Sequence, residues 1–273
     1  MILRSILRQR LEAWICVAVS VMGVLAFSWP FLTPLVPIAH GGFVALAAIV
    51  AASAVLFLLG ASLTGFSDSR ALALVGVLAA LAAAARLFSA GAGGIEFIFV
   101  VVILAGRALG PRGGFAVGAL GLAVSSLMWG GFGPWTPFQM LAIGWVGAGA
   151  GLIPASLKSF PRTEVGFLAV YGALSSYLFG ALMNLWFWPL AIGQGTSISL
   201  AEGEGLVANL ARFAVYCLTT STLTWDSVRA ITIVVTLGLI GVAALKALRR
   251  VSVVKGLDRE VLGLRVMEHE RVG

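Results

Sequence analysis

Aromatic rings and uncharged amides gather at the ends of several apolar segments of this 273-residue chain. The link GGFGPWTPFQM, from Gly130 to Met140, is rich in glycine, proline and rings and carries no charge. Such a set suits a pocket for a large, flat and mostly neutral ligand. It also fits the aromatic belt that membrane proteins place at the bilayer surface. The candidate binding residues are Trp129, Phe132, Trp135, Gln139, Asn184, Trp186 and Arg212.

Charged residues inside or beside apolar segments form a second candidate set. Charges in a membrane are costly, so they mark functional or structural sites. Arg86 and Glu96 flank a short turn, and we expect them to pair across it as a structural pin, with direct ligand contact as the alternative. Asp226 and Arg229 stand three residues apart, a spacing that predicts a local salt bridge on a helix. Arg212 has two interpretations, contact with an anionic or amide-bearing ligand and snorkelling to the interface.

One apolar segment, 71–92, is lined with small residues that allow another helix to approach closely. Gly76, Ala80 and Ala84 share one face, and Ala79 and Ala83 form an adjacent ridge. The partner is either another helix of the same chain or a separate subunit. The glycines of WVGAGAGL lie in an apolar helix, so they predict close helix packing and not a dinucleotide-binding loop.

The motifs of several enzyme classes are missing from the sequence. No GxxxxGK[ST] motif is present, so any ATP-driven step belongs to another chain. No metal-ligand spacing and no serine nucleophile elbow occurs, and we expect no metal site and no cofactor. We expect no Asp or Glu at mid-depth of the apolar segments, which argues against a proton- or sodium-driven transporter. No catalytic set is visible, so we do not expect an enzyme.

The composition predicts the elements that must position these residues. Hydrophobic residues make up 60% of the chain and charged residues 11%, and the mean hydropathy is +1.05. Runs of about 20 apolar residues are long enough to cross a bilayer as helices. We therefore expect an all-α, polytopic membrane protein. The apolar segments are 14–30, 42–64, 71–92, 95–109, 113–129, 138–157, 165–190, 206–223 and 227–248.

The basic residues indicate how these segments are oriented. Most of the 18 Lys and Arg residues lie in the two tails or in alternate loops, which the positive-inside rule places in the cytoplasm. This distribution explains the net charge of +7 without nucleic-acid binding. Both termini are then cytoplasmic and the number of crossings is even. We expect segment 206–223 to lie along the outer side or dip into it, which leaves eight crossings. The alternative is a true crossing that places the C-terminus outside, and the basic tail argues against it.

Three stretches resemble a known family. They are ILAGRALGPRGGFAVGALGLAVSS (103–126), WGGFGPWTPFQMLAIGWVGAGAGLIP (129–154) and TWDSVRAITIVVTLGLIGVAALKALRR (224–250). Together they resemble the substrate-binding (S) component of an energy-coupling factor (ECF) transporter, the vitamin-uptake branch of ABC importers. The resemblance implies a six-helix core with both termini inside. It divides the chain into a tail and extra transmembrane hairpin (1–66), an S-component core (67–250) and a cytoplasmic tail (251–273), which is either an amphipathic helix or a solvated tail.

The resemblance also implies a mechanism and partners. The S component captures a vitamin on the outer side of the bacterial plasma membrane. It then docks on a transmembrane coupling subunit through an Ala-x-x-x-Ala motif, which Ala79/Ala83 and Ala80/Ala84 both match, and two partner ATPases drive release. The aromatic lining favours a corrinoid such as cobalamin as ligand, with riboflavin-like rings second. A self-sufficient secondary transporter and, less favoured, a polytopic membrane enzyme are the alternatives.

Overall fold

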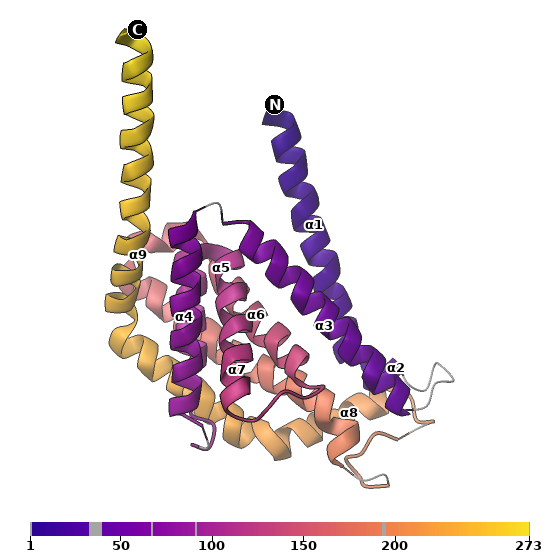
Figure 1. Cartoon of the computed structure of the whole chain (residues 1–273). Helices are drawn as coiled ribbons and strands as arrows, with labels where there is room; N and C mark the ends of the chain where they lie inside the picture. Colours follow the sequence, from indigo (N-terminus) through magenta and orange to yellow (C-terminus); the bar gives the residue numbers. More distant parts are fainter. Residues whose placement is uncertain are drawn as a thin grey trace.

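The computed structural model describes residues 2–32, 40–66, 68–90, 92–192, 195–201 and 203–272, and side chains only within 11–251, apart from His40. These residues form helices and no strand, which confirms the all-α, polytopic prediction (Figure 1). Five stretches are long and apolar enough to cross a membrane: Gly41–Thr64, Ser69–Phe88, Ile98–Met128, Pro161–Ala191 and Leu206–Val251. The elements are α1 (Ile2–Phe27), α2 (Trp29–Leu32), α3 (His40–Thr64), α4 (Ser69–Phe88), α5 (Ile98–Met128), α6 (Thr136–Leu152), η2 (Ala155–Ser159), α7 (Pro161–Ala191), α8 (Leu206–Cys217), η3 (Leu218–Asp226) and α9 (Ser227–Val272).

Element α5 is a pair of helical arms that folds back at Gly110. This glycine has φ 80° and ψ −179° and is followed by Pro111. A positive φ suits glycine, and proline cannot donate the backbone hydrogen bond that would continue the first arm. A Cβ on Gly114 would lie 2.7 Å from the Cα of Gly106, so the two arms pack against each other. The predicted segments 95–109 and 113–129 correspond to these arms.

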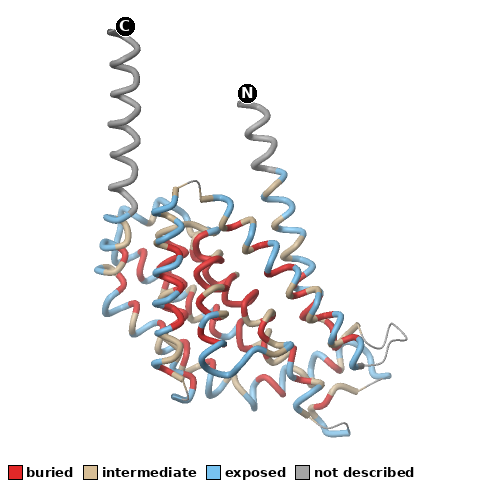
Figure 2. The backbone as a smooth tube through the Cα atoms, in the orientation of Figure 1, coloured by how far each residue is buried: buried red, intermediate tan, exposed pale blue. Residues whose placement is uncertain are grey.

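Glycines allow α6 to pack directly on both arms of α5. A Cβ on Gly106 or Gly114 would collide with the carbonyl of Gly147, and a Cβ on Gly151 would collide with the turn at Pro111. Close backbone approach of this kind is how membrane helices associate through small residues. The structure thus confirms the packing interpretation of the WVGAGAGL glycines. The buried residues concentrate on these central helices (Figure 2).

The last helices form one long antiparallel partner of α7. Backbone dihedrals stay helical at Leu218 and at Ser227, so α8, η3 and α9 run on without a break. Asn184 of α7 contacts Ser221 of η3. Segment 206–223 therefore continues directly into α9. The even number of crossings stays a prediction. The expectation that it lies along the outer membrane surface stays a prediction.

The N-terminal hairpin packs against the central helices through α3, which contacts α5 and α6. Aromatic rings at the end of α1 and in α2 pack this hairpin against the core. Phe27 meets Phe138 with ring centroids 4.8 Å apart, and Trp29 meets Trp186 at 5.8 Å. The helices α1 and α9 leave the bundle on the same side (Figure 1). The loop 129–135 and α8 lie at the opposite end of the bundle, which we call the loop end.

Candidate functional site

The first arm of α5 is short, and this brings a carboxylate into the bundle. Residues 98–109 span only about 18 Å as a helix, well below the roughly 30 Å of a bilayer core. Glu96 immediately precedes this arm, and its side chain is 29% exposed. It therefore meets groups on α9 that lie within the helix bundle.

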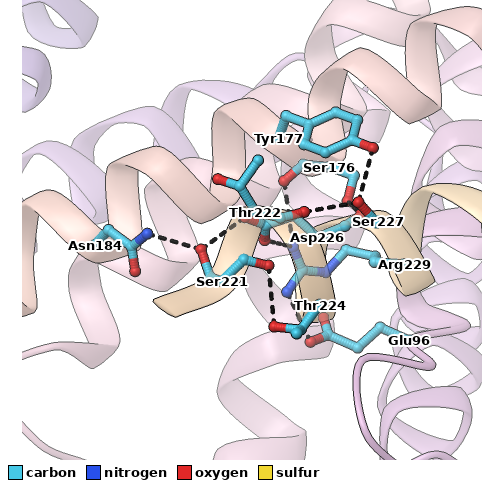
Figure 3. A network of polar contacts seen from close by, with 10 residues as sticks. All are labelled: Glu96, Ser176, Tyr177, Asn184, Ser221, Thr222, Thr224, Asp226, Ser227 and Arg229. Carbon is cyan, nitrogen blue, oxygen red and sulfur yellow. Dashed lines mark hydrogen bonds and ion pairs between the residues drawn. The ribbon is translucent and has the colours of Figure 1, made fainter. Parts of the chain in front are cut away.

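Arg229 is the centre of a buried polar network (Figure 3). Its Nη1 donates to Asp226 Oδ1 at 2.8 Å and to the Ser176 carbonyl at 3.2 Å. Its Nη2 donates to Glu96 Oε1 at 3.1 Å. The predicted pair between Asp226 and Arg229 is confirmed. The same guanidinium also joins the turn before α5 to the α7–α9 pair.

Two aromatic rings enclose the Arg229 guanidinium. Its Cζ lies 5.1 Å from the ring centroid of Phe99 and 5.1 Å from that of Phe179. Both rings present π electrons to the cation, which stabilises a charge held away from water. Arg229 is only 5% exposed, so the ion pairs form in a medium of low polarity, where electrostatic interactions are strong.

The network continues from Asp226 toward the end of α7. Asp226 Oδ2 accepts a hydrogen bond of 2.7 Å from Ser221 Oγ, and Ser221 Oγ accepts one of 2.7 Å from Asn184 Nδ2. Asp226 is 1% exposed. Gly180 of α7 makes room for its carboxylate, because a Cβ there would collide with both carboxylate oxygens. A continuous polar path thus joins Glu96 to Asn184 (Figure 3).

The π-helical element η3 sets the direction of these side chains. A π-helix is wider than an α-helix, is rare, and is frequently found at functional sites. Here, hydroxyl groups donate to backbone carbonyls of η3 and of the last turn of α8. The donors are Thr219 to Val215, Thr220 to Tyr216 and Ser227 to Thr222. The run of Ser and Thr residues was a visible signal for this element, although its polar partners were not predicted.

The structure brings together three of the seven candidate binding residues. Trp135 and Gln139 are one turn apart at the start of α6, and Gln139 N donates to the Trp135 carbonyl at 3.1 Å. The ring of Trp135 lies 6.5 Å from that of Phe187 on α7. Asn184 is one turn before Phe187 on the same helix, a spacing that puts the two on one face. We name Trp135, Gln139, Asn184 and Phe187 the loop-end cluster.

The other four candidates do not join this cluster. Trp186 is 1% exposed, and its ring packs 4.4 Å from that of Phe138, so it is a core residue. Arg212 pairs with Glu204 at 2.9 Å and donates to the carbonyls of Thr196 and Ser197. Trp129 and Phe132 are each 56% exposed beside the glycine-rich link.

The predicted partner of Arg86 is wrong. Arg86 Nη1 donates to Ser125 Oγ at 3.1 Å, whereas Glu96 pairs with Arg229. The reason is that Glu96 enters the bundle at the short first arm and meets α9. Proximity along the sequence gave the wrong pair, since the true partners are 133 residues apart.

A second ionic cluster lies at the end of the bundle opposite the loop end. Arg107, 4% exposed, donates to Glu164 at 2.6 Å and to the carbonyls of Ile153 and Pro154. Arg249 also donates to Glu164, at 2.5 Å. Arg107 is therefore buried between helix ends, beside the fold-back of α5.

Two acids are buried among the described side chains, and one of them, Glu164, lies in the first turn of α7 and not at mid-helix. Asp226 and Glu164 are 1% and 0% exposed, and an arginine pairs with each. Such pairing is typical of structural charges, whereas a transported proton needs a carboxylate that is free to titrate. No group of three or more His, Cys, Asp or Glu that would suit a metal ion occurs among the described residues.

The two small-residue ridges of α4 have different surroundings. Ala79 and Ala83 are 4% and 3% exposed, and their ridge faces the second arm of α5, where a Cβ on Gly121 would lie 3.2 Å from the Ala79 carbonyl. Gly76, Ala80 and Ala84 are exposed. The structure separates an internal ridge from an external one, which the sequence could not do.

The helices and the site define a multi-pass membrane protein with a polar and aromatic site inside one end of its bundle. Residues 70–204 match the family described as ECF transporter, substrate-specific component. The match identifies the chain as a member of that family, a transporter component. No match was found among curated proteins or among solved structures.

Proposed function

We propose that this chain captures a vitamin-type micronutrient on the outer side of the bacterial plasma membrane, at the loop-end cluster. The observation that carries the proposal is the meeting of Trp135 with Phe187, one turn from Asn184 and its bond to Ser221. Rings provide a large contact area for a flat ligand, and the amides orient it. A corrinoid such as cobalamin is our first candidate ligand and a riboflavin-like ring system the second.

The delivery step in this proposal uses partner proteins. The exposed ridge Gly76, Ala80 and Ala84 docks on a transmembrane coupling subunit, and two ABC ATPases hydrolyse ATP. The chain itself uses no cofactor. Both termini lie in the cytoplasm, an orientation supported by the basic residues near both ends and by the exit of α1 and α9 on the same side (Figure 1).

The buried network of Glu96, Arg229 and Asp226 lies next to this site and stabilises it. It fixes η3 against α7, so that Ser221 is held against Asn184 before any ligand arrives. A preorganised site avoids the entropic cost of ordering these groups during binding.

Replacing Trp135 and Asn184 together by alanine is expected to abolish binding while membrane insertion is kept. Loss of a stacking ring and an amide contact each costs about 1–3 kcal/mol, so the affinity should fall by roughly a hundredfold or more. We would measure binding of cobalamin and of riboflavin to the purified protein by equilibrium dialysis. Trp14, 71% exposed on α1, provides the matched control as Trp14→Ala. Unchanged affinity in the double variant for a ligand that the wild type binds would contradict the assigned site.

A further inference from the structure

A cavity of about 500 Å³ separates the N-terminal hairpin from the α5 turn. It lies between α1 and α3 near the end of α3, away from the loop end and the proposed capture site. Its lining divides by polarity: Glu12, Thr64 and Arg112 are polar, whereas Ile15, Leu56 and Phe57 are apolar. Leu56 and Phe57 are also 70% and 46% exposed on the outside of α3. A polar chamber that opens along exposed apolar side chains matches the build of a lipid, with its headgroup inside and an acyl chain along the helix.

The charges of this cavity come as a closely spaced cation and anion. Arg112 Nη2 lies 3.2 Å from Glu12 Oε2, and the two side chains are 48% and 42% exposed. An ion pair this open to its surroundings contributes little to stability, so each charge can also contact a ligand. Arginine binds phosphate with two parallel hydrogen bonds, and a carboxylate accepts from an ammonium group.

The end of α3 adds negative potential on the Glu12 side. The helix ends at Thr64, and the C-terminus of a helix carries partial negative charge that favours cations. Together with Glu12, it opposes a headgroup that is only anionic. The combination favours a zwitterion with a phosphate for Arg112 and an amine for Glu12 and the helix end.

Two glycines, one in α3 and one directly after it, shape the cavity. A Cβ on Gly65 would approach Arg112 Cδ to 2.8 Å, so the missing side chain allows the arginine to lie against the backbone. A Cβ on Gly60 would meet no atom within 4 Å, although Gly60 lines the cavity. A larger residue at Gly60 would therefore fill the cavity without displacing the core.

We propose that this cavity binds one zwitterionic aminophospholipid, with its phosphate on Arg112 and its ammonium group between Glu12 and the end of α3. This lipid lies in the leaflet on the side where α1 and α9 leave the bundle, and it fills the gap between the N-terminal hairpin and the core. The proposal is independent of which ligand the loop-end cluster takes.

Native mass spectrometry of the full chain in detergent, titrated with dioleoyl-phosphatidylethanolamine, tests this proposal. The wild type is expected to bind one such lipid roughly tenfold more tightly than dioleoyl-phosphatidylglycerol, because the neutral glycerol of the second lipid cannot form the charge-assisted bond to Glu12. Arg112→Gln and Gly60→Leu are each expected to lower the affinity for the ethanolamine lipid by roughly tenfold, the first by loss of charge and the second by loss of space.

Matched controls separate these effects from general damage. Lys158→Gln removes an exposed positive charge elsewhere, and Gly41→Leu adds the same side chain to α3 where a Cβ also meets nothing within 4 Å. Both should bind as the wild type does. Equal or tighter binding of the glycerol lipid by the wild type would overturn the proposal without any variant. Equally tight binding of free phosphoethanolamine, which has no acyl chain, would also overturn it, as would unchanged affinity in both test variants.

Discussion

Replacing Ala80 and Ala84 with leucine is expected to abolish uptake of the substrate while its binding stays unchanged. Both alanines are on the exposed ridge of α4, away from the loop-end cluster. A leucine at either position prevents the close helix approach that small residues permit. Overpacking a close contact costs about 1–3 kcal/mol per site, so two sites should weaken docking by at least tenfold.

The measurement compares substrate uptake by cells that contain the ECF partners with equilibrium binding by the purified variant. Ala45→Leu, at an exposed position on α3, is the matched control and should support normal uptake. Ala83→Leu is a contrasting variant, because Ala83 is 3% exposed and its replacement should destabilise the fold itself. Normal uptake by the Ala80/Ala84 variant would show that this ridge faces lipid and not a partner.

The second large effect is expected from Arg229→Met, which leaves two carboxylates in the bundle without their cation. Removing one partner of a buried ion pair costs about 3–5 kcal/mol, which corresponds to a fall of roughly 10 °C in Tm for a chain of this size. Because η3 would lose its attachment near Asp226, the contact between Ser221 and Asn184 should loosen and ligand binding should weaken too.

A thermal unfolding series in detergent checks this prediction. Arg162→Met removes an exposed arginine from the start of α7 and should change the Tm little. The triple variant Glu96→Gln, Asp226→Asn and Arg229→Met removes all three charges and should recover part of the lost stability, since no unpaired charge remains. A Tm for Arg229→Met equal to that of the wild type would mean that the network does not hold these helices together.

The sequence was sufficient for features that depend on local spacing. The apolar runs predict the helices, the glycines of WVGAGAGL predict close packing, and the spacing of Asp226 and Arg229 predicts their salt bridge. Each of these depends on residues within one segment, where helix geometry alone determines which side chains are neighbours.

Features that depend on how deep a segment lies in the bundle could not be predicted. The fold-back at Gly110 leaves a short first arm, and this redirects Glu96 from Arg86 to Arg229. Trp186 is one of the candidate binding residues at the segment ends, but its ring packs between Phe138 and the N-terminal hairpin. The run of Ser and Thr before Asp226 was visible, yet its π-helical form depends on partners on α7 that are far away in the sequence.

As a substrate-specific component of an ECF transporter, this chain is expected to capture its substrate and to dock on a coupling subunit. The most direct test of this expectation is affinity purification of the tagged chain from its native membrane, with mass spectrometry of the proteins recovered. We expect recovery of a second polytopic subunit and ABC ATPases with the wild type, and their loss with the Ala80→Leu/Ala84→Leu variant. Recovery of the chain alone, after crosslinking under conditions that keep a known membrane complex intact, would contradict this expectation.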